Sequence, residues 1–147
     1  MSMRDHANHI QLKRVISPVS EAGNNALVGQ IIDRQDAESL TYLILIGSLG
    51  DAGAEFAVLL EHGDDAALGD ASAVADADMI SQTYGTAPEA AASFIQSDDD
   101  EVRKLGYIGD KRYSRLTITP ANNGTASLIA AAAILKMKNT PVVQASA

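Results

Sequence analysis

The chain has 147 residues, the length of one domain, and with 46% hydrophobic residues it can bury a core without cross-links. It has no cysteine, which excludes disulfides and thiolate chemistry, and no apolar run of the roughly 20 residues that a membrane span requires. The net charge of −8 argues against a dominant basic surface, so we expect neither nucleic acid nor membrane as a partner.

Charge is segregated along the chain. Residues 33–101 carry sixteen acidic side chains and one basic side chain, Arg34, whereas the two flanks together carry ten basic and three acidic ones. Two interpretations stay open. The acidic segment is a solvated surface that keeps the protein soluble, or the molecule has a negative outer face and basic ends that dock on a partner.

The first quarter of the chain predicts an arm followed by two strands. Residues 1–9 are polar and lack periodicity, and they lack the apolar centre of a signal peptide, so we interpret them as an N-terminal arm. Residues 10–19 look extended, with Pro18 marking an edge strand or a strand end. A second strand is expected over residues 26–33, after a turn at residues 21–25.

The middle of the chain predicts a hairpin and a long loop. The apolar run of residues 40–46 is typical of a central strand covered on both sides. Residues 54–61 alternate between apolar and polar, so we expect them to pair with that run in a hairpin. Residues 62–91 predict a long loop with one short strand or helical turn, and residues 92–96 a short strand.

Residues 104–119 predict two strands joined by a tight turn at Gly109 and Asp110. Glycine suits such a turn because it readily adopts a positive φ. The residues after the turn alternate, which is typical of a strand with one buried face and one wet face. The expected inward residues are Ser114, Leu116 and Ile118, and the expected outward residues are Tyr113, Arg115, Thr117 and Thr119.

The last element, residues 126–136, has the composition of a helix because it is rich in alanine. We nevertheless predict a strand, since Asn123 and Gly124 would complete a hairpin with residues 112–119. Residues 137–147 are interpreted as a C-terminal arm.

About eight short strands separated by turn signals predict an all-β fold, an antiparallel β-sandwich of jelly-roll-like type. We expect one domain at residues 10–136, between extended N-terminal (1–9) and C-terminal (137–147) arms. Only 4% of the residues are aromatic, so the core is expected to be thin and to gain stability from neighbours in an assembly.

Few side chains suggest a metal site. The acidic loop at residues 64–78 offers carboxylates for Ca²⁺, but no stretch of it matches the full calcium-loop pattern of a central glycine followed by a terminal glutamate, so a solvated loop is the favoured interpretation. His6 and His9 could share a metal only on a helix, and His62 is expected to be a lone surface residue. We therefore predict no metal.

Catalytic patterns are missing as well. The chain has no Gly-x-Ser-x-Gly elbow, no phosphate-binding loop and no dinucleotide fingerprint, so we expect no enzyme, no catalytic residue and no cofactor. One basic and aromatic cluster could stack single-stranded nucleic acid, although packing on a sheet face is the favoured explanation. This cluster comprises Tyr107, Lys111, Arg112, Tyr113 and Arg115.

Three segments carry a resemblance to a known group of proteins. Residues 1–10, 74–78 and 105–113 read MSMRDHANHI, VADAD and LGYIGDKRY. Together they resemble small virion proteins of tailed bacteriophages and related prophages, which are encoded near the capsid genes; that group often has Val at the position of Ser114. The resemblance implies a capsid decoration, or cement, protein that sits as a homotrimer on the outer capsid surface after assembly in the host cytoplasm.

We therefore expect a structural protein that binds the major capsid protein and copies of itself. Alternatives are a head–tail joining or tail component, and a glycan-binding module for the host surface. We also expect that deletion of residues 1–14 leaves a folded domain that no longer decorates heads. The residues predicted to contact the capsid or a neighbouring copy are Arg4, His6, His9, Lys13, Arg14, Arg112, Tyr113 and Arg115.

Overall fold

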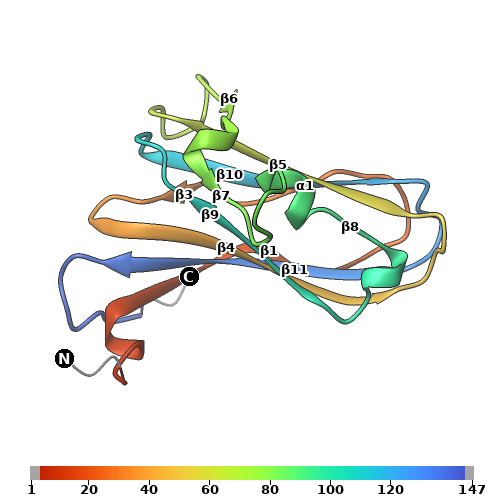
Figure 1. The fold of residues 1–147 in the computed structure, drawn as a ribbon, viewed down its shortest axis with the longest axis horizontal. Coiled ribbons are helices and arrows are strands. Elements are labelled where there is room, and N and C mark those ends of the chain that lie inside the picture. Colours follow the sequence, from red (N-terminus) through yellow and green to blue (C-terminus); the bar gives the residue numbers. More distant parts are fainter. Residues whose placement is uncertain (1–3, 145–147) are drawn as a thin grey trace.

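The computed structural model describes residues 4–144 and folds them into two antiparallel sheets packed together (Figure 1). Sheet A runs in the order β1 (Ile10–Glu21), β11 (Ser127–Met137), β4 (Ala37–Leu49), β9 (Val102–Tyr107) and β7 (Met79–Ile80). Sheet B runs in the order β2 (Leu27–Val28), β10 (Tyr113–Ala121), β5 (Glu55–Gly63) and β6 (Ser72–Ala73). The predicted all-β sandwich is confirmed, whereas its jelly-roll-like character stays a prediction.

Short elements fill the connections. Strand β3 (Ile32–Asp33) pairs with β10, and β8 (Phe94–Ile95) pairs with β5. The five-residue helix α1 (Pro88–Ala92) and 3-10 turns at Ala7–His9, Asp76–Asp78 and Gln96–Asp98 complete the list of elements. No helix among residues 4–144 is long and apolar enough to span a membrane.

The three predicted hairpins are wrong, because each joins strands of different sheets. Strand β4 lies in sheet A and β5 in sheet B, β9 lies in sheet A and β10 in sheet B, and β11 returns to sheet A. A short polar connection can form a hairpin turn within one sheet or an arch between two packed sheets, and the sequence does not distinguish the two. Alternation identifies which face of a strand is buried, but it does not identify the strand with which it pairs.

The turn at Gly109 needs glycine for a different reason from the predicted one. The positive φ angles of this chain lie at Asp36, Leu68, Asp100, Asn122 and Gly85, among the described residues. A Cβ at Gly109 would lie 2.5 Å from the hydroxyl of Tyr107, so the position is closed to any side chain. Close approach, and not backbone handedness, therefore selects glycine here.

The alanine-rich segment forms strand β11, as predicted, but its neighbours differ from the prediction. It pairs with β1 on one side and with β4 on the other, which makes it a central strand of sheet A. Its inward alanines, Ala131 and Ala133, are buried against sheet B. Tertiary pairing on both edges outweighs the intrinsic helix preference of alanine.

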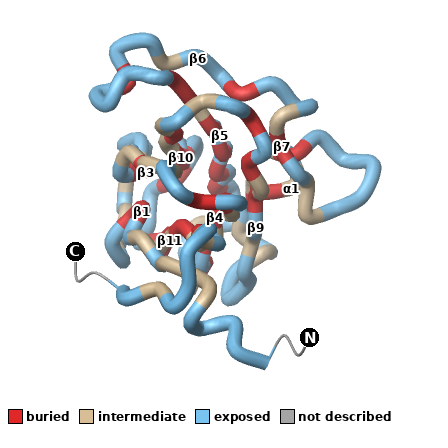
Figure 2. The backbone as a smooth tube through the Cα atoms, turned by 90° about the vertical axis from the view of Figure 1, so that its left-hand side faces the viewer, coloured by how far each residue is buried: buried red, intermediate tan, exposed pale blue. Residues whose placement is uncertain are grey.

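The buried residues line the space between the two sheets (Figure 2). They include four of the six aromatic residues, Tyr42, Phe56, Phe94 and Tyr107. Phe56 and Phe94 stack with ring centroids 4.8 Å apart. Tyr42 is fully buried, and its hydroxyl lies 2.6 Å from the hydroxyl of Ser114, which is itself buried. The predicted inward set of β10 is confirmed, because Leu116 and Ile118 are buried beside Ser114.

The two ends of the described chain lie close together at the left of Figure 1. The backbone N–H of Val142 donates to the carbonyl of Asn8 over 2.9 Å. Residues 1–3 and 145–147 of the predicted arms lie outside the described residues. Because β1 begins at Ile10, deletion of residues 1–14 would remove part of the ladder with β11, so that deletion does not test an arm alone.

Candidate docking surface

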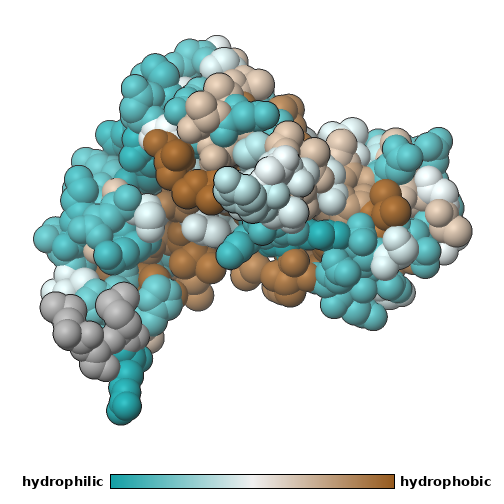
Figure 3. Space-filling view, viewed as in Figure 1, coloured by the Kyte–Doolittle hydropathy of each residue, from teal (hydrophilic) through white to brown (hydrophobic). Residues whose placement is uncertain are grey.

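The outer face of sheet A is apolar and exposed. The prediction that the run of residues 40–46 is covered on both sides is wrong. Tyr42 and Ile44 face the core, whereas Leu45 is 47% exposed. Brown surface lies along the lower part of the molecule, where Figure 1 places β4, β9 and β11 (Figure 3). Five large apolar residues on this face are between 47% and 56% exposed: Leu12, Leu45, Ile80, Val102 and Leu128.

Strand register arranges these side chains in rows, because residues directly opposite one another project from the same face of a sheet. One row joins Leu12 of β1, Ile134 of β11 and Thr41 of β4. Another joins Ala130, Leu45 and Val102. The two rows together place apolar side chains on four neighbouring strands, β1, β11, β4 and β9.

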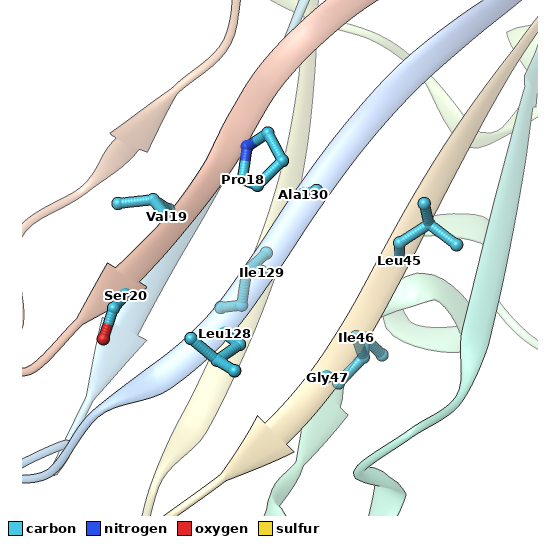
Figure 4. A pocket seen from close by; sticks show the side chains of 9 residues that line it. All are labelled: Pro18, Val19, Ser20, Leu45, Ile46, Gly47, Leu128, Ile129 and Ala130. Carbon is cyan, nitrogen blue, oxygen red and sulfur yellow. The ribbon is translucent and has the colours of Figure 1, made fainter.

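A hollow opens at one end of this face (Figure 4). Pro18, Leu45 and Leu128 surround a floor that includes Ala130 and Gly47, and the hollow has a volume of about 510 Å³. A Cβ at Gly47 would lie 3.0 Å from the Cβ of Leu128, so glycine keeps the floor low. The small residues leave room for an apolar side chain of a partner.

Two cations occupy the ends of a third row, which lies between the two apolar rows. Arg14, Ala132, Leu43 and Lys104 occupy one row across β1, β11, β4 and β9. Three strand spacings separate the two basic residues, which corresponds to roughly 14 Å between their Cα atoms. Arg14 donates to the hydroxyl of Ser17 over 2.6 Å, and neither cation has an ion-pair partner within residues 4–144.

Ion pairs connect the basic flanks to the acidic segment. Each of the ion pairs within residues 4–144 joins a base from a flank to an acid of the segment 33–101. Folding therefore neutralises part of the charge separation seen along the sequence, and most of the acidic side chains take part in no ion pair within residues 4–144. The pairs are Arg103–Asp98, Arg103–Glu101, Lys111–Asp64, Arg112–Asp33, Arg115–Glu61 and Lys136–Glu38.

The predicted contact residues Arg112, Tyr113 and Arg115 form an internal network on sheet B. Arg112 donates two hydrogen bonds of 2.9 Å to the carboxylate of Asp33, and its guanidinium lies 5.0 Å from the ring centroid of Tyr113. These hydrogen bonds lower the pKa of Asp33 below its ordinary value. Arg115 is paired with Glu61 over 3.2 Å. The geometry favours packing on the sheet over stacking with nucleic acid.

The predicted N-terminal contact residues are only partly brought together. Lys13 donates to the carbonyl of Asp33 over 3.2 Å, so Lys13 and Arg112 meet at the same residue. Arg4 and His6 are exposed and His9 is half-buried. The side chains of these last three form no hydrogen bond or ion pair within the described part of the chain.

His62 is buried, which corrects the prediction of a lone surface histidine. Its Nδ1 lies 2.9 Å from the hydroxyl of Tyr107. That hydroxyl also accepts a hydrogen bond from the backbone N–H of Lys111 over 3.1 Å. Because His62 comes from β5 and Tyr107 from β9, the contact ties the two sheets together.

The acidic loop uses its carboxylates to hold its own backbone. Asp70 accepts hydrogen bonds from the backbone N–H groups of Asp64 and Asp65, and these bonds lower its pKa. Asp64 in turn pairs with Lys111 over 2.8 Å. Within residues 4–144 no three His, Cys, Asp or Glu side chains form a group that could hold a metal ion.

Sequence reasoning missed the apolar face of sheet A, although its signal is visible in residues 40–46 and 126–136. Both runs are apolar on both sides of the strand, and we interpreted the first as a sign of burial on both sides. In the structure one face of each of these strands is exposed to solvent instead, as Leu45 and Leu128 show. The chain matches no model of a known protein family and no curated protein, so these surfaces have to be interpreted from their own chemistry.

Proposed function

We propose that this chain is a structural virion protein that docks on the major capsid protein and stabilises a phage head from outside. The observation that carries the proposal is the continuous exposed apolar face of sheet A with its hollow between Pro18, Leu45 and Leu128. Soluble monomers rarely leave such a wide apolar surface uncovered, and a patch of this kind is typical of a protein interface.

The charges on the outer face of sheet A indicate the chemistry of the expected partner surface. Arg14 and Lys104 lie without acidic partners beside Leu43 and Ala132. A complementary surface would offer an apolar side chain for the hollow and carboxylates on either side. The resemblance of residues 1–10, 74–78 and 105–113 to virion proteins encoded beside capsid genes supports the capsid as the source of that surface.

The proposal is tested with heads of the encoding phage that were produced without this protein. Purified protein is added, the heads are sedimented, and the bound copies per head are counted. We expect wild-type protein to bind in hundreds of copies, and Leu45→Asp/Leu128→Asp to bind at least about tenfold more weakly, since central interface residues contribute about 2 kcal/mol or more. Arg14→Glu/Lys104→Glu is expected to weaken binding as well.

Matched controls come from the other sheet and from a distant cation. Val28 and Leu59 are similarly exposed apolar residues on the outer face of sheet B, so Val28→Asp/Leu59→Asp should bind like wild type. Lys138→Glu controls for net charge. Equal binding of all variants would refute docking through sheet A, and binding of only six or twelve copies would indicate a neck component.

A further inference from the structure

The long edge of sheet A is partly covered by residues 142–144. Strand β1 is the outermost strand of sheet A and has twelve residues. The carboxamide of Gln144 binds both main-chain groups of Leu12: its Oε1 accepts from the N–H over 2.8 Å, and its Nε2 donates to the carbonyl over 2.7 Å. The backbone N–H of Val142 donates to the carbonyl of Asn8, which precedes Leu12 by four residues.

This arrangement occupies the positions that a neighbouring strand would use. The N–H and C=O of Leu12 point away from β11, since they bind Gln144 on the outer edge. In an antiparallel ladder the residues two positions away, Ile10 and Arg14, share that orientation. Their outward main-chain groups form no hydrogen bond within the described residues. The edge therefore carries a short row of groups competent for strand addition at residues 10–14, which ends where the carbonyl of Val15 accepts a hydrogen bond from the backbone N–H of Gln30 over 2.9 Å.

The other edges of the sandwich are blunted too. At the opposite edge of sheet A, the Oε1 of Gln82 accepts from the backbone N–H of Lys104 over 2.9 Å. Sheet B ends in β2, β3, β6 and β8, each of two residues. Among these edges, β1 alone is a long strand, and its cover of residues 142–144 contributes little buried surface, because Val143 is 86% exposed.

We propose that residues 142–144 are a releasable guard of the β1 edge, and that the uncovered edge pairs with β1 of a second copy. A strand related to its own copy by a two-fold axis pairs antiparallel. With Leu12 opposite its copy, Arg14 faces Ile10, so no like charges lie directly opposite. Leu12 is half exposed, and the apolar faces of both copies would then continue across the joint. The inference does not depend on a capsid.

The test uses purified protein and sedimentation velocity over a range of concentrations. Deletion of residues 142–147 and the single substitution Gln144→Ala are both expected to make self-association at least tenfold tighter than in wild type. Val143→Ala, in the same segment, should behave like wild type. In the same samples, hydrogen exchange of the Leu12 amide should accelerate in dilute Gln144→Ala and slow again as the concentration rises.

A second substitution locates the contact. In the full chain the N–H of Leu12 binds Gln144 and not β11, so adding Leu12→Pro to the truncated chain removes an edge donor without loss of a bond to β11. This variant should therefore return self-association to the wild-type level. Should that variant not fold, Leu12→Lys places two like charges opposite each other and has the same expected result. Unchanged association on removing the guard, or association that survives the Leu12 substitution, would overturn the proposal.

Discussion

Ser114 is a polar residue in the middle of the core, and a single partner explains its place there. Its hydroxyl lies 2.6 Å from that of Tyr42, and both side chains are buried. A buried hydroxyl without a partner is costly, whereas a paired one is nearly neutral. A serine at position 114 is therefore compatible with burial of this face of β10.

We expect Ser114→Ala to lower the free energy of unfolding by about 1–3 kcal/mol, because it leaves the Tyr42 hydroxyl buried and unpaired. In the double variant Ser114→Ala/Tyr42→Phe both polar groups are gone, so its loss should be smaller than the sum of the two single losses. Urea unfolding of the four proteins measures this cycle. A double loss equal to the sum would show that the hydroxyls are not coupled.

Asp51 joins two connections that are far apart in sequence. Its carboxylate accepts hydrogen bonds from the backbone N–H of Gly53 over 3.0 Å and of Gly124 over 2.8 Å, and these lower its pKa below 3.8. A lowered folded pKa means that the stabilisation is complete above the unfolded value near 3.8 and is lost as the pH falls toward the folded value.

The predicted consequence is a pH dependence of unfolding. Between pH 5 and pH 3 the free energy of unfolding of wild type should fall more steeply than that of Asp51→Asn, in which this titration is absent. Denaturant titrations at several pH values measure both slopes. Parallel slopes for the two proteins would contradict the role assigned to the Asp51 carboxylate.

At the scale of elements, β11 shows how a sequence of small residues becomes a central strand. Its pairing with β1 and β4 satisfies both backbone edges, and its alternate residues divide between the core and the outer face. Ala133 is fully buried, whereas its neighbour Ala132 is partly exposed on the outer face of sheet A.

The pair of substitutions Ala133→Leu and Ala132→Leu tests this division. Ala133→Leu overfills the core and should lower the free energy of unfolding by about 1–3 kcal/mol. Ala132→Leu adds an exposed side chain, so its effect should stay within about 0.5 kcal/mol. Equal losses, measured by urea unfolding, would mean that β11 does not present these two faces.

The sequence predicts faces better than neighbours. Alternation correctly identifies Ser114, Leu116 and Ile118 as inward residues, since it depends only on local geometry. Pairing depends on contacts between distant segments, such as β1 with β11, and no local pattern encodes them. The three hairpin predictions failed for this reason. The exposed outer face of sheet A was not predicted, because an apolar run does not indicate whether one or both faces of its strand are buried.

For the whole molecule, ion pairs lie on both sheets, and sheet A in addition exposes several large apolar side chains on its outer face. Bases of the flanks pair with acids of the segment 33–101, while Arg14 and Lys104 remain beside the open apolar face of sheet A. One broad sheet is thus suited to lie against a partner surface. Its long edge at Leu12 is closed by Gln144, which keeps strand pairing separate from docking.

The most direct test of the proposed docking is a reconstruction, at a resolution that resolves strands, of the phage particle to which we propose this chain belongs. We predict that this chain covers the shell in many copies, with Leu45, Leu128 and the hollow beside Pro18 buried against the major capsid protein. Arg14 and Lys104 should face carboxylates of the shell. A chain found only at the neck or tail, or one on the shell with the outer face of sheet A open to solvent, would contradict the account.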